Sequence, residues 1–308
     1  MSPASQMRWA VTGNQSKFGL GCALSTPVTR SGAVDTARLV EHARWVQAQG
    51  CDILTVFGTT GEGASFTLKD RAAVLEAFAG AGIAAERTVL GVMATAIADA
   101  AEQARLAAEA KCRGILLTPP YYLKDLDGNG LYAWFAELFE TLGAKARNVI
   151  LYHIPSVTAV PIGVDLVRRL SKAFPGVVLG VKDSSCDWSN TQVLLSAFSK
   201  THAILVGDER DLARAVREGG QGCISGLANV APDLMLPLVR QGRDEPRVNR
   251  LVEEIGKYPV LPAVKSLIAH RTGDSGWLAV RPPLVALDAA RAERLAAACD
   301  LIRQARAA

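Results

Sequence analysis

Short apolar runs alternate along the chain with Ala-rich segments whose apolar residues recur at helical spacing. The apolar runs are residues 18–24 (FGLGCAL), 52–57 (DILTVF), 88–93 (TVLGVM), 114–118 (GILLT), 148–153 (NVILYH), 177–182 (VVLGVK), 203–207 (AILVG) and 222–226 (GCISG). Each is followed by a loop with Gly, Pro, Ser or Thr and then by a helix-like segment. Eight strand and helix units over roughly 220 residues match the (β/α)8 TIM barrel in number and length, and we therefore predict this fold.

The pattern changes at about residue 243, after which only helix-like segments follow. We therefore expect an N-terminal extension at 1–17, a catalytic barrel at 18–242 and a C-terminal helical appendage at 243–308. A doubly wound α/β sheet is the alternative fold. It is less favoured, because neither a GxGxxG fingerprint between a strand and a helix nor a P-loop occurs in the sequence.

Composition narrows the class of protein further. The 308 residues are 49% hydrophobic and 21% charged, which is typical of a globular protein with a large core. The net charge of +4 is small and the basic residues are scattered among acids, so we expect no nucleic-acid partner. No apolar run approaches membrane-spanning length, and no signal-peptide h-region occurs at the N-terminus, so we expect a cytoplasmic protein with no membrane association.

The cysteines do not indicate a metal site or a disulfide framework. They are Cys22, Cys51, Cys112, Cys186, Cys223 and Cys299, which are far apart and form no CxxC pair. We expect reduced core thiols and no bound metal.

The sixth apolar run ends on a lysine, in the sequence LGVKDSS. Burying an ammonium ion is costly, and an apolar environment favours the neutral amine, which is the nucleophilic form. Such an amine can add to a ketone and form a Schiff base that eases cleavage or formation of the adjacent carbon–carbon bond. Tyr152 ends the preceding strand and could relay protons. Alternatively, Lys182 points to solvent and Tyr152 is a core residue.

The loop after the second strand, GTTGEG at 58–63, offers consecutive backbone N–H groups and the hydroxyls of Thr59 and Thr60. This is a setting suited to a carboxylate. Gly-rich turns after barrel strands are common, however, so the motif alone is only suggestive. Glu62 could cap the helix that follows rather than take part in catalysis.

Five ordered motifs, GTTGEG, LTPPYY, LYHIPSVT, GVKDSS and GGQGCISG, closely resemble those of the dihydrodipicolinate synthase and N-acetylneuraminate lyase family of class I aldolases. The resemblance covers about 18–242. It implies a (β/α)8 barrel, a homotetramer, pyruvate bound as a Schiff base, no other cofactor and no metal.

The resemblance also implies roles for single residues. Lys182 is similar to the Schiff-base lysine, and Tyr152 to the tyrosine that relays protons. Thr59 and Thr60 resemble the hydroxyl pair beside the pyruvate carboxylate, with Thr59 also linked to the tyrosine. A further tyrosine of the family is supplied across a subunit interface. Two adjacent residues compete for that role here, and the register favours Tyr121 over Tyr122.

More residues are expected to line the substrate pocket, on the same resemblance. They are Gly58, His153, Val157, Ser184, Asp208, Glu209, Ile224 and Ser225. Val157 stands where the dihydrodipicolinate synthases have an arginine that holds the carboxylate of aspartate semialdehyde. His153 replaces the usual asparagine, and a satisfied core histidine is the favoured interpretation. Asp208 and Glu209 match positions that bind sugar hydroxyls, although acids at the start of a helix also cap it.

The sequence therefore predicts a pyruvate-dependent class I aldolase. Its expected reaction is the reversible cleavage of a 2-keto-3-deoxy sugar acid, or a similar 2-oxo acid, to pyruvate and an aldehyde. Three alternatives stay open: a Schiff-base dehydratase of a keto-deoxy acid, a dihydrodipicolinate synthase, and a non-catalytic barrel that binds a keto acid.

Overall fold

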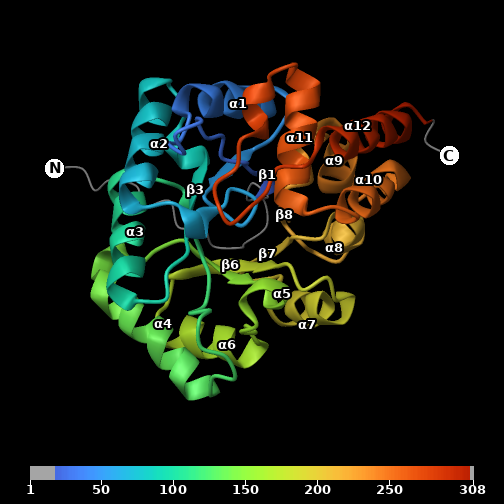
Figure 1. Ribbon diagram of the computed structural model, residues 1–308. Helices are drawn as coiled ribbons and strands as arrows, with labels where there is room; N and C mark the ends of the chain where they lie inside the picture. Colours follow the sequence, from blue (N-terminus) through green and yellow to red (C-terminus); the bar gives the residue numbers. More distant parts are fainter. Residues whose placement is uncertain (1–17, 306–308) are drawn as a thin grey trace.

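The computed structural model describes residues 18–305, and eight parallel strands in it close into a barrel (Figure 1). The strands are β1 (Gly19–Ala23), β2 (Ile53–Val56), β3 (Thr88–Val92), β4 (Gly114–Leu117), β5 (Val149–His153), β6 (Val178–Asp183), β7 (Ala203–Val206) and β8 (Gly222–Ser225). All eight predicted strands are confirmed, and their ends differ from the prediction by one residue at most. Each strand pairs with its neighbours in chain order, and β8 pairs with β1.

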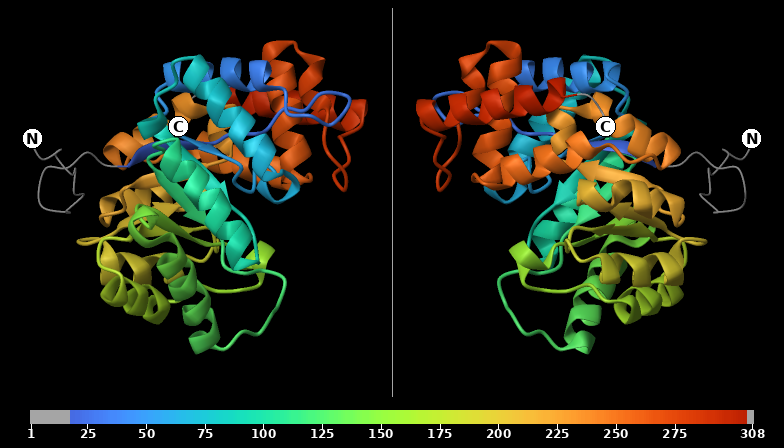
Figure 2. Two further views of the ribbon diagram at one scale, coloured as in Figure 1. Left: turned by 90° about the vertical axis from the view of Figure 1, so that its left-hand side faces the viewer. Right: turned by 90° about the vertical axis from the view of Figure 1, so that its right-hand side faces the viewer.

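Helices surround the barrel (Figures 1 and 2). They are α1 (Thr36–Ala48), α2 (Leu68–Gly80), α3 (Ile97–Glu109), α4 (Gly128–Leu142), α5 (Pro155–Thr158), α6 (Val164–Ala173), α7 (Trp188–Phe198), α8 (Leu212–Arg217), α9 (Pro232–Gln241), α10 (Pro246–Gly256), α11 (Val260–Thr272) and α12 (Ala289–Gln304). Short 3-10 turns are η1 (Gly63–Ser65), η2 (Ala85–Arg87), η3 (Gly143–Lys145), η4 (Glu209–Asp211), η5 (Leu227–Asn229) and η6 (Ser275–Leu278). Within residues 18–305, no helix has the length and apolar character needed to cross a membrane.

The helical region predicted after residue 243 consists of α10, α11, η6 and α12. In Figure 1 these elements lie beside α9 and α1, on one side of the barrel. The long loop between β4 and α4 and the loop before α12 project from the same end of the molecule (Figure 2). The predicted N-terminal extension, 1–17, lies outside the described residues.

The cysteine prediction is confirmed only in part. All six thiols are unpaired, but Cys186 is exposed and Cys112 is half-buried, so neither is a core thiol.

Two apolar clusters sit on the two faces of the barrel wall. The larger lies between strands and helices. The inner cluster contains Phe18, Ala23, Ile53, Val89, Met93, Leu116, Ile150, Tyr152, Ile154, Ala203, Leu205 and Ile224. Alternate residues of a strand face opposite sides of the sheet, so these positions identify the inward face of each strand.

The strand register stacks the inward side chains in layers, and alternate strands supply each layer. Followed around the barrel, the register puts Thr55, Leu116, Lys182 and Ile224 at one height. The next layer consists of Ala23, Gly91, Tyr152 and Gly207. Only Tyr152 in this second layer has a side chain longer than a methyl group. The space above the lysine layer is therefore left to the Tyr152 side chain, because the other three strands place only small residues there.

A buried polar network holds the C-terminal ends of β1 and β8 together. Asn229 donates to the carbonyl oxygens of Ala23 and Gly226, both at 2.8 Å, and its Oδ1 accepts from the N–H of Ser25. Its Oδ1 also lies 2.9 Å from Nε2 of His42, whose Nδ1 is 3.3 Å from the Arg271 guanidinium. His42 thus donates through Nε2 and accepts through Nδ1, which is possible only for a neutral ring.

We expect this histidine to make the fold sensitive to acid. Burial, together with the nearby Arg271 guanidinium, lowers the pKa of His42 from 6.5 to about 4, against the opposing effect of the hydrogen bond that His42 donates to Asn229. Below its ordinary pKa the unfolded chain binds a proton that the folded chain does not. The stabilisation is therefore fully present above about pH 6.5. As the pH drops toward about 4, the free energy of unfolding falls by about 2–3 kcal/mol.

Urea denaturation of the wild type and of His42→Gln at about pH 7 and about pH 4.5 measures this loss. Glutamine keeps an amide donor for Asn229 but does not titrate. The wild type should lose about 2–3 kcal/mol more than the variant between the two conditions. An equal loss in both proteins would show that His42 is not the titrating group.

Candidate active site

Lys182 and Tyr152 form a buried pair inside the C-terminal mouth of the barrel. They are directly opposite each other in the β5–β6 register, and each side chain faces inward. The Lys182 Nζ lies 3.2 Å from the Tyr152 hydroxyl and 4.3 Å from the centre of its ring. The Thr59 hydroxyl lies 3.1 Å from the same Tyr152 hydroxyl. An unbroken chain of polar atoms thus runs from the lysine to the loop after β2.

The GTTGEG loop turns tightly above this chain. The N–H of Glu62 donates to the carbonyl oxygen of Thr59 at 2.9 Å, and that of Gly63 donates to Gly58 at 3.0 Å. Within residues 18–305, the N–H groups of Thr59 and Thr60 donate to no other group. Both residues are half-buried, and in this part of the chain their N–H groups are left without a protein acceptor. Adjacent unused N–H groups of this kind are suited to binding a carboxylate.

Close packing against the barrel requires glycine in this loop. A Cβ on Gly63 would lie 1.9 Å from the carbonyl oxygen of Phe57, and one on Gly61 would lie 2.7 Å from that of Leu24. Phe57 itself has a positive φ of 57°, an uncommon conformation for a bulky residue. The loop is therefore pinned to one conformation by its contacts with β1 and β2.

Asp183 fixes the other end of the site, and the sequence analysis missed it. It follows Lys182 directly and is buried on the opposite face of β6. Its carboxylate accepts from the Thr191 hydroxyl at 2.7 Å and from the Ser185 N–H and the Asn190 amide, both at 3.0 Å. Through these hydrogen bonds the Asp183 carboxylate connects the end of β6 to α7. The sequence did offer a signal for this residue, because in LGVKDSS an acid directly follows the lysine that ends the strand.

His153 lies outside the pocket, contrary to its place among the expected substrate residues. It follows Tyr152 on β5 and therefore faces the opposite side of the sheet. Its Nδ1 accepts from the N–H of Ile162 at 2.9 Å, which puts the ring proton on Nε2. Burial lowers the pKa of His153, although Asp183 opposes this shift. This geometry agrees with the favoured interpretation of a core histidine with its hydrogen bond satisfied.

Three further expected residues are bonded to protein partners: Ser225 and Glu209 to each other, and Asp208 to Arg210. Ser225 faces outward on β8, 3.4 Å from the sulfur of Met235, and its hydroxyl donates to Glu209. Burial raises the pKa of Glu209, and the hydrogen bond from Ser225 opposes this shift. Asp208 caps η4 through the N–H of Arg210 and pairs with the guanidinium of that residue. The capping alternative thus describes Asp208 better than sugar binding does.

Small residues bring other expected positions close to the mouth. A Cβ on Gly207 would lie 1.9 Å from the Ser184 hydroxyl, which locates that hydroxyl beside the Tyr152 layer. A Cβ on Gly226 would lie 3.1 Å from the Thr60 hydroxyl. Ile224 is buried in the layer of Lys182. Ser184 and Ile224 therefore lie at the heights of Tyr152 and Lys182, and Thr60 lies beside the end of β8.

The outer rim carries exposed residues. Tyr122 is 80% exposed and Val157, in α5, is 61% exposed, whereas Tyr121 is half-buried. Lys124 joins the two segments, because its Nζ donates to the carbonyl oxygens of Tyr121 and Thr158. The β4–α4 loop and α5 thus form one continuous part of the rim.

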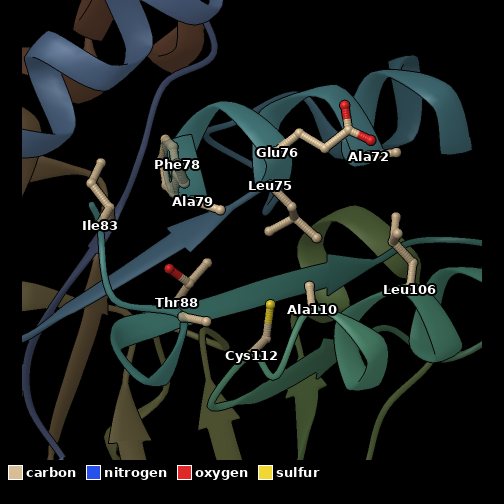
Figure 3. A pocket seen from close by; sticks show the side chains of 11 residues that line it. Ala72, Leu75, Glu76, Phe78, Ala79, Ile83, Thr88, Leu106, Ala110 and Cys112 are labelled. Atoms are coloured by element: carbon tan, nitrogen blue, oxygen red, sulfur yellow. The ribbon is translucent and has the colours of Figure 1, made fainter. Parts of the chain in front are cut away.

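A separate hollow of about 260 Å³ lies on the outside of the barrel, between α2, α3 and the start of β3 (Figure 3). Its lining is largely apolar and includes Leu75, Phe78, Ile83 and Leu106. It has no lysine and is not part of the Lys182 site.

A (β/α)8 barrel with a buried lysine beside a tyrosine hydroxyl at its C-terminal mouth is the arrangement of a class I aldolase, a carbon–carbon lyase that works through a Schiff base. The chain belongs to the Dihydrodipicolinate synthetase family, whose model matches residues 17–301. This finding confirms both the predicted family and the predicted enzyme class.

Individual relatives agree with this assignment. An uncharacterized DapA-like lyase from Chloroflexus aurantiacus is 32% identical, over 92% of this chain and 96% of its own length. A solved dihydrodipicolinate synthase from Agrobacterium tumefaciens is 49% identical, covers 93% of this chain and 99% of its own, and superposes with a TM-score of 0.90. YagE from E. coli K12, solved with pyruvate, shares the fold with a TM-score of 0.83 at 21% identity, over 94% and 99% of the two chains.

Proposed function

We propose that this protein condenses pyruvate reversibly with an aldehyde, or cleaves the corresponding 2-keto-3-deoxy acid, through a Schiff base on Lys182. The observation that supports this most is the Lys182–Tyr152–Thr59 chain, with contacts of 3.2 and 3.1 Å, beneath the free N–H groups of Thr59 and Thr60. A binding protein for a keto acid has no need of an amine and a phenol in contact. Pyruvate itself is the ketone, as in the solved complex of YagE.

The residues suggest an order of steps. The amine nitrogen of Lys182 attacks the C2 carbonyl of pyruvate, and the carbonyl oxygen leaves as water once protons have been moved to it. Loss of a proton from C3 gives an enamine, which attacks the aldehyde carbon. Tyr152, hydrogen-bonded to Thr59, passes protons to and from these centres, and water finally releases the product. Throughout, the N–H groups of Thr59 and Thr60 hold the substrate carboxylate.

Reduction with borohydride tests the covalent step. Incubation of the wild type with pyruvate and borohydride should add the mass of one reduced pyruvyl group per chain, and peptide mapping should find it on Lys182. Deuterium exchange into the methyl group of pyruvate should be catalysed as well, because the enamine forms without any aldehyde. An unmodified protein with no exchange would favour the keto-acid-binding alternative.

The aldehyde partner is proposed to be uncharged at its far end. Position 157 holds a valine and not an arginine. The nearby cation, Lys124 of the β4–α4 loop, already donates to two carbonyl oxygens, one of them that of Thr158 at the end of α5. A panel of aldehydes and 2-keto-3-deoxy acids, assayed for pyruvate consumption or release, would identify the partner. Loss of water from a keto-deoxy acid without release of pyruvate would identify the dehydratase alternative instead.

Aspartate semialdehyde is expected to be a poor substrate. Its carboxylate would meet the apolar Val157 side chain and forgo a charge-assisted pair worth about 1.5–3 kcal/mol, which corresponds to roughly 10- to 100-fold in kcat/KM. A coupled assay of dihydrodipicolinate formation measures this. Val157→Arg should improve the reaction, and efficient turnover by the wild type would contradict the proposal.

A second copy of the chain is proposed to complete the site, within a homotetramer. Tyr122 and Leu123 are largely exposed on the rim next to Val157, which gives an apolar surface suited to packing against another subunit. Of the two adjacent tyrosines, Tyr122 is the more accessible to a neighbouring chain.

A further inference from the structure

The GTTGEG loop and the 3-10 turn η1 that follows it are held from outside the barrel by three cationic side chains. Arg71 of α2 donates to the carbonyl oxygen of Gly63 at 2.7 Å, and Arg281 donates to that of Ser65 at 2.7 Å. Lys265 of α11 pairs with the Glu62 carboxylate, with 2.5 Å between Nζ and Oε1. Two of these three residues come from the C-terminal helical region. A region that the sequence suggests is an appendage therefore contacts the loop of the candidate site directly.

Glu62 connects this contact to the proposed ligand donors. Its backbone has a left-handed φ of 57°, and its N–H closes the turn onto the carbonyl oxygen of Thr59. The Thr59 and Thr60 N–H groups lie within this turn. The Glu62 side chain leaves the turn in the direction of α11, so its position and that of the turn are coupled. It makes no side-chain cap, contrary to the alternative considered from the sequence.

The pair is fully buried, since the side chains of Glu62 and Lys265 are each 1% exposed. The Lys265 Nζ also donates to the carbonyl oxygen of Ala279 at 3.1 Å. Burial lowers the pKa of Lys265, and the Glu62 carboxylate opposes this shift. A buried ion pair is often no more stabilising than apolar side chains of similar volume. Stability alone therefore gives little reason for two charges at this place.

We propose that Glu62 and Lys265 are positioning residues for the substrate carboxylate. Through their contact, α11 fixes the turn that presents the N–H groups of Thr59 and Thr60, and the C-terminal helical region is part of the catalytic unit. This inference rests on the proposed function. It concerns only how the carboxylate is held, because neither residue contacts Lys182 or Tyr152.

The test is the pyruvate concentration that gives half-maximal borohydride trapping and half-maximal methyl-proton exchange. Glu62→Gln keeps the size of the side chain and removes the charge. We expect the half-saturating concentration to rise about tenfold, as for a binding group that is slightly displaced, with the saturating rate within about twofold of wild type. Glu245→Gln is the matched control. It removes a carboxylate that pairs with Arg247 in the same helical region, away from the GTTGEG loop, and should change neither value.

The double variant Glu62→Gln/Lys265→Met removes both charges and guards against misfolding of the single variant. It should unfold at a temperature close to that of wild type and still show the raised half-saturating concentration. The inference would be overturned if the double variant had the half-saturating pyruvate concentration of wild type. It would also be overturned if Glu62→Gln were less stable than wild type but had an unchanged half-saturating concentration. Absence of trapping in the wild type and in Glu245→Gln would instead mean that the proposed function has failed.

Discussion

Lys182→Ala is expected to form no borohydride-stable adduct with pyruvate and to catalyse no exchange of the pyruvate methyl protons. Lys182 is the inward-facing lysine in contact with Tyr152, and alanine leaves no amine at that place. Removal of the nucleophile of a covalent mechanism costs several orders of magnitude, so we expect exchange to fall by about 10⁴-fold or more. Intact-mass spectrometry and proton NMR in deuterated water measure the two effects.

Lys145→Ala is the control for this experiment. Its ammonium group lies on the surface, paired with Glu109, and the variant should behave as wild type in both assays. The buried lysine of α11, Lys265, provides a second comparison by peptide mapping and should stay unmodified. An adduct of undiminished yield on Lys182→Ala would show that another lysine carries the substrate.

Tyr152→Phe is expected to separate proton transfer from Schiff-base formation. Phenylalanine keeps the ring whose centre lies 4.3 Å from the Lys182 Nζ, but it removes the hydroxyl that joins Lys182 to Thr59. General acid–base catalysis by a positioned side chain contributes about 10²- to 10⁴-fold. Exchange of the methyl protons should fall within this range, while the adduct still forms when trapping is allowed to run for longer.

Thr59→Val refines the interpretation of this result. It leaves the Tyr152 hydroxyl in place and removes only its second partner, so exchange should fall less than in Tyr152→Phe. The pH profile of exchange should shift as well, because the hydrogen bond that orients the phenol is lost. If Tyr152→Phe exchanges protons at the wild-type rate, the relay does not pass through this tyrosine.

Much of the fold was predictable because burial in a parallel barrel leaves a local signature. A strand covered on both faces is a short apolar run, and eight such runs separated by helix-like segments define the architecture. Lys182 and Tyr152 could be located for the same reason, since each ends a strand and strand ends meet at the mouth. Their chemistry followed from residue type, because an amine and a phenol at one mouth suit few other roles.

Other parts of the site depend on which way a side chain faces, and the residue types alone did not decide this. His153 and Ser225 lie one residue from inward-facing positions, and the strand pleat turns both of them out of the barrel. Asp208 and Glu209 have nearby partners, Arg210 and Ser225, that compete with a substrate for their carboxylates.

The sequence by itself determined the barrel, the family and the lysine–tyrosine pair, because strand patterns and short motifs are local along the chain. Only the tertiary structure decided how the carboxylate loop is held. Lys265 is about 200 residues from Glu62 along the chain, and no pattern in either segment announces the other. Their contact exists because α11 packs over the mouth end of the barrel, and two charges can be buried there only where each is opposite the other.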